Sequence, residues 1–458
     1  MNFSRAAKTV SLLLLILNGY SAAVFSDEFP GYDIKAAVDA GKKELTAVQT
    51  VNYTNLTALP LNEVYFYIYP NREYSVEEKE FMLRYSAYFK VNPFPEGFEN
   101  GGIDIRAVKS FGKDFSFQVE GKDRTLLKVV LPAPLGTGET VTLTLDYHVK
   151  IPHAYGRFGW HEDIIKLSRW YPVLCVLDEN GWHLNPSYPF HRPFYSDAAN
   201  YSVELTVPAN QQVVHSGVLK YEKAAGNTKI LTINSTSPIR EFSLAMSPRY
   251  NLLEEAAGGI KFKSYYLPGD EFHAKAALKD AQDLFAFYAE RFGKYPYPEF
   301  SIVPVHLGYG GEQMSNLAFI DTRVYKLPKF LMRYFDFLVA HESGHQWFYN
   351  MVGMDEFSEM WLEEGVNSYF IAEYLGQKYG ENAAVVEFPR WLKKLEWIFP
   401  ELTFKRTRDV RYKIMSRIKG YDHAAVGKLS SFQEPSSIFS VTYGKGCRIV
   451  QMLRAQIG

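Results

Sequence analysis

The sequence predicts an α+β protein of more than one domain, because strand patterns fill its first half and helical patterns its second. The chain has 458 residues, which is too long for one ordinary core, so we expect two domains of roughly 200 residues each. Hydrophobic residues make up 47% of the chain, as is typical of folded globular proteins. We therefore expect a β domain over residues 26–248 and a mainly helical domain over residues 249–458.

Alternating apolar and polar residues predict strands in the first half. In residues 140–149, Val, Leu and Tyr alternate with Thr, Asp and His. This two-residue period is typical of a half-buried strand. Similar periods in residues 63–69 and 201–207 predict two more strands. We expect this half to be an antiparallel β domain.

Beyond about residue 250 the apolar residues take helical spacing. Residues 271–292 predict a helix, residues 300–305 a buried strand and residues 308–311 a flexible glycine loop before a strand at 317–320. A long helix is expected next, with Pro328 in its first turn and residues 331–349 as its apolar body. This segment is apolar on almost every face, so the helix should lie inside its domain.

The first 25 residues have the layout of a secretory signal peptide. Arg5 and Lys8 precede an apolar run at residues 10–17, and small residues follow at 21–23. This order predicts an exported protein that is secreted, periplasmic or on the cell surface. The run is short for a bilayer span, which favours a cleaved signal peptide over the alternative of an uncleaved signal anchor. No other transmembrane segment is expected.

Charge and cysteine content argue against a nucleic-acid-binding protein and against a disulfide-rich protein. Fifty Lys and Arg balance 51 Asp and Glu, so no global field attracts nucleic acid, and we expect no nucleic-acid partner. Only two cysteines are present, Cys175 and Cys447. They cannot form a disulfide framework, so we interpret both as buried small hydrophobic residues.

The predicted buried helix carries the H-E-x-x-H pattern, with histidines at His341 and His345 and a glutamate at Glu342. Residues four apart share one face of a helix, so both imidazoles can reach one zinc ion while Glu342 points toward its open position. Catalytic zinc sites of this kind add a carboxylate ligand. Glu363 and Glu364 lie downstream on the next expected helix, and spacing alone does not choose between them.

Around these motifs the chain resembles the zinc aminopeptidases of the aminopeptidase N and leukotriene hydrolase family. That family places eighteen residues between the second histidine and its ligand glutamate, within a W-L-x-E-G segment, and this chain has W-L-E-E-G at residues 361–365. The resemblance implies that Glu364 is the third ligand. It also implies one Zn²⁺ ion, peptide substrates and a saddle-like β domain followed by a thermolysin-like catalytic domain.

Two further segments resemble motifs of the family. Residues 443–446 match its Y-x-K-G segment, which implies that Tyr443 is the catalytic tyrosine. Gly310, Gly311, Glu312 and Gln313 stand where the family has G-x-M-E-N, whose glutamate binds the free amino group of the substrate. When the chain is aligned with the family from the strand that follows, Gln313 falls at the position of the family's glutamate. Either Glu312 performs this role or the amine is held less tightly.

A looser match at residues 169–172 makes Glu162 a weak candidate for a residue that faces the active site. The family usually continues into more helices beyond the tyrosine, so we expect residues 249–458 to be a C-terminally incomplete domain.

These residues together predict a zinc peptidase. We expect Glu342 to take the proton of the attacking water and Tyr443 to stabilise the oxyanion. An aminopeptidase is the first hypothesis. The alternatives are an endopeptidase or a peptide hydrolase that does not require a free amino terminus, and, more remotely, a non-catalytic peptide-binding module. The oligomeric state is left open.

Overall fold

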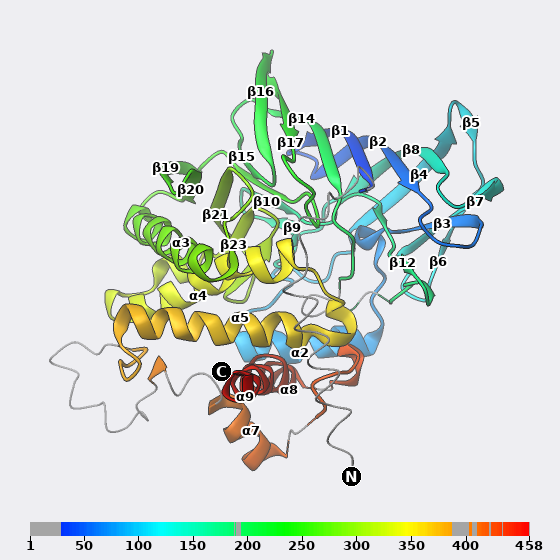
Figure 1. Cartoon of the computed structure of the whole chain (residues 1–458). Coiled ribbons are helices and arrows are strands. Elements are labelled where there is room, and N and C mark those ends of the chain that lie inside the picture. Colours follow the sequence, from blue (N-terminus) through cyan, green and yellow to red (C-terminus); the bar gives the residue numbers. More distant parts are fainter. Residues whose placement is uncertain are drawn as a thin grey trace, which may run out of the picture.

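The computed structural model describes residues 29–186, 188, 194–386, 403–404, 410–420, 423–432 and 434–457. The expected signal peptide, residues 1–25, lies outside these ranges and stays a prediction. Sheets occupy the upper part of the molecule in Figure 1, and helices from the second half lie below them. The α+β class and the two-part arrangement, with a large β region followed by a helical part, are therefore confirmed.

The largest sheet has eight strands, formed by the first half of the chain. Their spatial order is β16 (Val218–Ala225), β17 (Thr228–Asn234), β14 (Asn200–Pro208), β1 (Gly31–Asp39), β2 (Glu44–Thr54), β8 (Thr140–Lys150), β4 (Gly102–Ser110) and β5 (Lys113–Asp114). Buried and exposed residues alternate along β1 and along much of β2, as a sheet with one face on the core requires. β1 runs parallel to β14. The sheet is thus mixed, and the expectation of a wholly antiparallel domain is wrong at this pair.

Smaller sheets complete the β-rich region. One contains β15 (Gln212–His215), β18 (Leu244–Ser247), β10 (Ile164–Leu167) and β9 (Phe158–His161). Another contains β11 (Val173–Leu174), β3 (Leu61–Tyr67), β7 (Leu126–Leu135) and β6 (Phe117–Glu120), and β12 (Leu177–Asp178) pairs with β13 (Gly181–Trp182).

Two expectations for the first half need correction. The strand predicted at residues 63–69 ends at Tyr67, because a tight turn follows over Tyr69–Asn71, in which Pro70 has no backbone N–H to continue the strand pairing. The sequence pattern also missed a helix, α2 (Val76–Phe89). Ser75 caps this helix by accepting from the backbone N–H of Glu78, whose side chain accepts from the backbone N–H of Ser75 in return.

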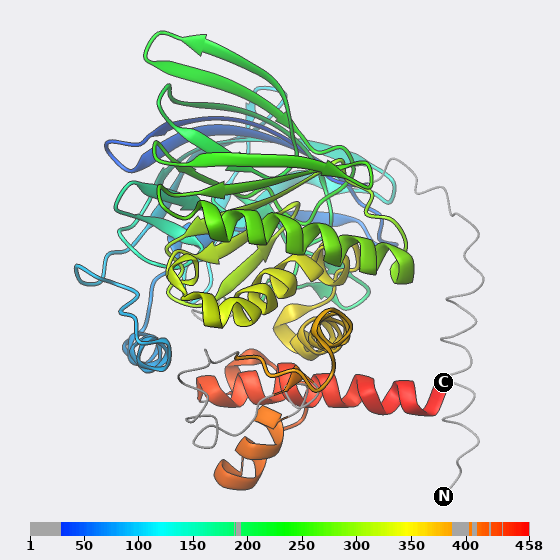
Figure 2. The ribbon, with the colours of Figure 1, turned by 90° about the vertical axis from the view of Figure 1, so that its left-hand side faces the viewer.

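The second half combines a five-stranded sheet with helices. The sheet has the order β19 (Asn251–Ala257), β20 (Ile260–Tyr266), β21 (Glu299–Val305), β23 (Leu317–Asp321) and β22 (Gly311–Met314), so β22 is an edge strand. The α-helices among the described residues of this half are α3 (Glu271–Phe292), α4 (Met332–Gly344), α5 (Glu356–Tyr379), α7 (Val410–Lys419), α8 (Pro435–Ile438) and α9 (Gly446–Ile457). In Figures 1 and 2, α5 lies between α4 and α9.

The helix expected at residues 331–349 is shorter than predicted. α4 ends at Gly344, and a π-type turn, η4 (Gln346–Met351), follows it. Phe348 and Tyr349 have non-helical backbone angles inside that turn. The apolar pattern continues past Gly344 because the turn is itself buried, so hydrophobicity did not reveal where the helix ends.

The two parts of the molecule share one hydrophobic core. A single cluster of buried residues runs from Ile34 in β1 to Val339 in α4 and Ile371 in α5. The helix that carries the histidines is thus held from the β side as well as by its helical neighbours. Among the described residues, no helix combines the length and the apolar character that a membrane span needs.

Candidate active site

His341, His345 and Glu364 meet where the end of α4 faces α5. The Nε2 atoms of the two histidines lie 3.2 Å apart. Oε2 of Glu364 lies 3.2 Å from Nε2 of His341 and 3.4 Å from Nε2 of His345. All three side chains are buried. The structure therefore brings the two histidines of one helix and the glutamate of the next to a single point.

The donor atoms have the chemistry and the spacing that zinc requires. Tetrahedral zinc binds nitrogen and oxygen ligands at about 2.0–2.1 Å, which separates neighbouring ligand atoms by about 3.3 Å. The three separations here, 3.2, 3.2 and 3.4 Å, agree with one shared tetrahedral shell. Three protein atoms leave the fourth position of such a shell for water or substrate.

Polar neighbours prepare His345 and Glu364 for a cation. Nδ1 of His345 lies 3.0 Å from the carbonyl oxygen of Phe348 and 3.0 Å from Oε1 of Glu363. Two acceptors at Nδ1 require a ring proton there, so Nε2 is the nitrogen that would give its lone pair to a metal in place of a proton. Burial alone would raise the pKa of Glu364, but the neighbouring imidazoles of His345 and His341 hold it well below its ordinary value. The glutamate is therefore charged, as a ligand must be.

Tyr443 lies against the same carboxylate. Its hydroxyl donates to Oε1 of Glu364 at 2.8 Å, and its ring lies 5.6 Å from that of His341. Burial and the charge of Glu364 raise the pKa of Tyr443 well above its ordinary value, so the phenol keeps its proton and can donate it in a hydrogen bond.

Two glycines allow this approach of Tyr443 to the ligand helix. Gly365 follows Glu364 in α5, and Gly446 begins α9 three residues after Tyr443. A Cβ atom on Gly365 would lie 2.6 Å from the carbonyl carbon of Gly446, and one on Gly446 would lie 3.0 Å from Cα of Gly365. Side chains at either position would force the two backbones apart.

Glu342 lies beside the Gly-rich strand β22. The side chain is buried, and a Cβ atom on Gly311 would lie 2.5 Å from its Cγ and 2.8 Å from its Oε1. Gly310 packs on Leu338 of α4, with its would-be Cβ 2.8 Å from Cδ2. The absence of a side chain at Gly311 therefore leaves Glu342 the space that it occupies.

Glu312 and Gln313 point to opposite sides, as neighbours in a strand do. Glu312 pairs with Arg157 of the β region at 3.0 Å and accepts a hydrogen bond from the hydroxyl of Tyr309. Gln313 instead donates from Nε2 to Oε1 of Glu363 in α5. The side chain that reaches α5 is thus the neutral Gln313, while Glu312 is engaged on the other side.

The remaining candidates lie outside this group. Glu162 is 55% exposed and pairs with Arg249 at 3.0 Å, which supports a surface position rather than an active-site role. Arg169 is buried and pairs with Glu241 at 3.5 Å. Cys175 and Cys447 are both buried, as expected, and the structure joins neither of them in a disulfide.

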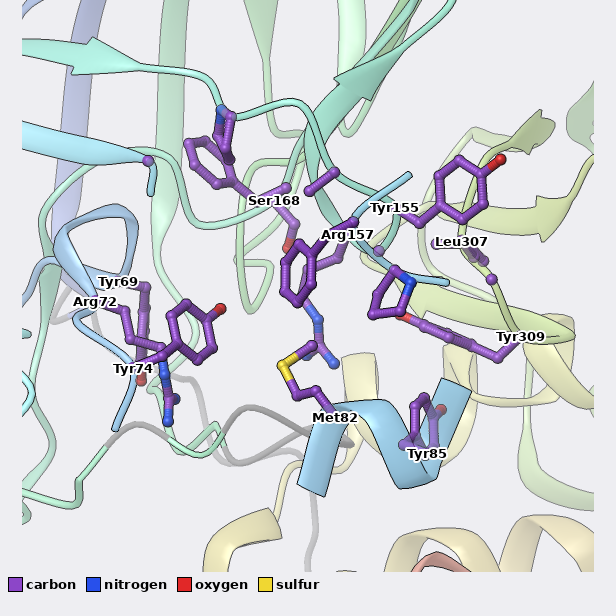
Figure 3. Close-up of a pocket in the computed structure, with 18 of the residues that line it drawn as sticks. Tyr69, Arg72, Tyr74, Met82, Tyr85, Tyr155, Arg157, Ser168, Leu307 and Tyr309 are labelled. Atoms are coloured by element: carbon purple, nitrogen blue, oxygen red, sulfur yellow. The ribbon is translucent and has the colours of Figure 1, made fainter. Parts of the chain in front are cut away.

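Sequence reasoning missed a cavity beside the Gly-rich loop, shown in Figure 3. Its volume is about 170 Å³, and its lining includes Arg72 and Arg157 from the β region, Met82 and Tyr85 from α2 and Tyr309 from the loop. The helix that was missed therefore forms one wall. The capping pair Ser75 and Glu78 was the local signal that could have revealed it.

Comparison with known proteins supports these geometric observations. Residues 276–458 match the Peptidase family M1 domain. Aminopeptidase M1 of Arabidopsis thaliana is 23% identical over 271 residues, which cover 57% of this chain and 29% of that protein. Glutamyl aminopeptidase of Mus musculus is 26% identical over 294 residues, which cover 61% of this chain and 29% of that protein. The chain spans less than a third of the length of these relatives.

Solved structures show the same fold. The M1 zinc metallopeptidase from Deinococcus radiodurans has a TM-score of 0.59 and 16% identity, and the alignment covers 94% of this chain and 84% of that one. A mutant of that protein bound to a Tyr-Ser-Ala substrate has the same TM-score and coverage. The resemblance to the zinc aminopeptidases is therefore confirmed, and residues 276–458 are the part that matches the Peptidase family M1 domain.

Proposed function

We propose that this protein is a zinc aminopeptidase that hydrolyses peptide bonds and releases residues from the amino end of peptides. The observation that carries this proposal is the meeting of His341, His345 and Glu364, whose donor atoms lie 3.2–3.4 Å apart. Within the described residues, this is the one group of His, Cys, Asp and Glu side chains spaced to hold a metal. We accordingly propose a single zinc ion.

The residues of the chain divide the chemistry between them. When bound, zinc acts as a Lewis acid that polarises the scissile carbonyl and makes the attacking water more acidic. Glu342 accepts the proton of that water as general base and passes it to the leaving amine. Tyr443 keeps its proton and donates a hydrogen bond to the carbonyl oxygen as it becomes negative.

The finer architecture is also a proposal. We propose a saddle-like β domain over residues 26–248 and a thermolysin-like catalytic domain over residues 249–458. The position of β19 supports this boundary, because that strand starts at Asn251 and opens the five-stranded sheet next to the metal-ligand helices. Separate expression of residues 249–458, followed by thermal unfolding, tests whether this part folds alone.

One observation favours a second candidate function. Gln313 is neutral and Glu312 is paired with Arg157, so neither offers an unpaired carboxylate to a substrate ammonium group. A peptide hydrolase or endopeptidase that accepts blocked amino termini is therefore the alternative. Cleavage rates on a free peptide and on its acetylated form decide between the two, since an aminopeptidase cleaves only the free form.

A panel of aminoacyl fluorogenic amides, assayed with and without a chelator, tests the main proposal. We expect hydrolysis that the chelator abolishes and added zinc restores. Glu342→Gln should bind zinc normally and lose hydrolysis, because the amide cannot accept the proton. Glu290→Gln makes the same change on the exposed side of α3 and should leave hydrolysis intact. Full activity in Glu342→Gln would refute the general base, and a non-catalytic module predicts no hydrolysis in any of these proteins.

We further propose that the protein is exported. Arg5, Lys8 and the apolar run that follows them support this. Mass spectrometry of the amino terminus after expression in the native host tests it, with cleavage near residue 25 as the expected result and an intact Met1 in the cytoplasm as the contrary one.

A further inference from the structure

A buried chain of hydrogen bonds joins the edge strand β22 to the metal ligand His345. Gln313 in β22 donates from Nε2 to Oε1 of Glu363, and the same oxygen lies 3.0 Å from Nδ1 of His345. Gln313 is 3% exposed, Glu363 2% and His345 0%. Glu363 lies next to the ligand Glu364 in sequence, but it faces the outer nitrogen of the imidazole and not the metal position.

The chemistry of these groups fixes the direction of each hydrogen bond. A carboxylate can only accept, so both the amide nitrogen of Gln313 and Nδ1 of His345 donate to it. Nδ1–H in turn leaves Nε2 as the free donor atom for a metal. A carboxylate in this place holds the ring at one angle and makes Nε2 more basic, as outer carboxylates do at zinc sites in general.

Glu363 needs a partner because it is buried. A buried carboxylate without hydrogen bonds is costly. The Nδ1–H group of His345 is not enough for Glu363, because the carbonyl oxygen of Phe348 competes for it at 3.0 Å. The amide of Gln313 supplies a second donor from a different element. A glutamate at position 313, as in the family pattern, would place two carboxylates against each other here.

We propose that Glu363 is a positioning residue for the metal ligand His345, and that Gln313 holds Glu363 in this place from β22. The neutral residue at 313 and the acidic residue at 363 are then one matched pair. This inference rests on the proposed zinc site and adds to it a structural link between the Gly-rich strand and the metal.

Zinc affinity, measured on the full chain by competition with a chelator of known affinity, tests the role of Glu363 without any assay of activity. We expect Glu363→Ala to bind zinc about 10- to 100-fold more weakly. Glu363→Gln keeps an acceptor for Nδ1–H and should lose less. Glu373→Gln makes the same chemical change about three turns further along α5, where the partner is Arg454, and should bind zinc like the wild type.

A double substitution tests the pairing itself. Gln313→Glu should weaken zinc binding, because two carboxylates then face each other. Combining Gln313→Glu with Glu363→Gln restores one donor and one acceptor, since the new amide can accept from His345 and donate to the new carboxylate. The double variant should therefore bind zinc more tightly than Gln313→Glu alone, which simple damage to the fold cannot produce.

The outcomes separate this inference from the proposal on which it rests. If the wild type binds no zinc, the proposed zinc peptidase fails. If the wild type binds zinc and Glu363→Ala binds it equally well, the positioning role alone is overturned. If the double variant binds zinc no better than Gln313→Glu, the pairing of residues 313 and 363 is overturned.

Discussion

Gly311→Ala is the substitution that most directly probes how β22 shapes the catalytic geometry. The new methyl group would lie 2.5 Å from Cγ of Glu342 and 2.8 Å from its Oε1. Ordinary contact begins near 3.4 Å, so the glutamate or the strand must move by about 0.9 Å to relieve the overlap. A displacement of about 1 Å in a catalytic group costs roughly 100-fold in rate, or about 2.7 kcal/mol in the activation barrier.

Steady-state kinetics on a fluorogenic aminoacyl amide measure this effect. We expect kcat to fall about 100-fold while zinc content and the unfolding temperature stay close to those of the wild type. Gly310→Ala is the matched control, because its methyl group would meet only the end of the Leu338 side chain at 2.8 Å, which can rotate away. Equal kcat values for the two variants would refute the placement of Glu342 against Gly311.

Three other substitutions give separate tests. Tyr443→Phe keeps the ring beside His341 but removes the donor, so kcat should fall about 10²- to 10³-fold with normal zinc content by elemental analysis. Lys166 is buried, and burial lowers its pKa to about 7, so between pH 7 and its unfolded value near 10.5 the unfolded state binds more protons and stability rises with pH. Lys166→Met should therefore raise the free energy of unfolding most at pH 7 and below, by about 4 kcal/mol before the lost hydrogen bond to Ala154 is subtracted. Urea titrations should show this gain shrinking toward pH 10. Burial likewise lowers the pKa of His215 to about 4, so wild-type stability should fall as pH drops from 6.5 toward 4, and His215→Leu should flatten that part of the urea-derived profile.

Local patterns predicted much of the fold and the centre of the site. The two-residue period of β8 and the helical period of α3 depend only on neighbouring residues, and both elements lie where they were expected. The convergence of His341 and His345 follows from four-residue spacing on one helix, which is also local. Spacing alone did not predict the third ligand, because it left Glu363 and Glu364 equally possible. The resemblance to the family selected Glu364.

These local patterns did not predict contacts between segments that are distant in the sequence. A strand with alternating burial looks the same whether its neighbour is parallel or antiparallel, so the parallel pairing of β1 with β14 left no trace in the sequence. The hydrogen bond from Gln313 to Glu363 joins residues fifty positions apart. The end of α4 at Gly344 was hidden for another reason, because the turn that follows is as apolar as the helix.

The central claim is that His341, His345 and Glu364 hold one zinc ion beside Glu342. Anomalous diffraction from crystals of the zinc-loaded protein, collected on both sides of the zinc absorption edge, tests it most directly. The account predicts one strong zinc peak at about 2.0–2.2 Å from Nε2 of each histidine and from a carboxylate oxygen of Glu364. A zinc peak bound by Glu363 in place of Glu364, or located away from the two imidazoles, would contradict it.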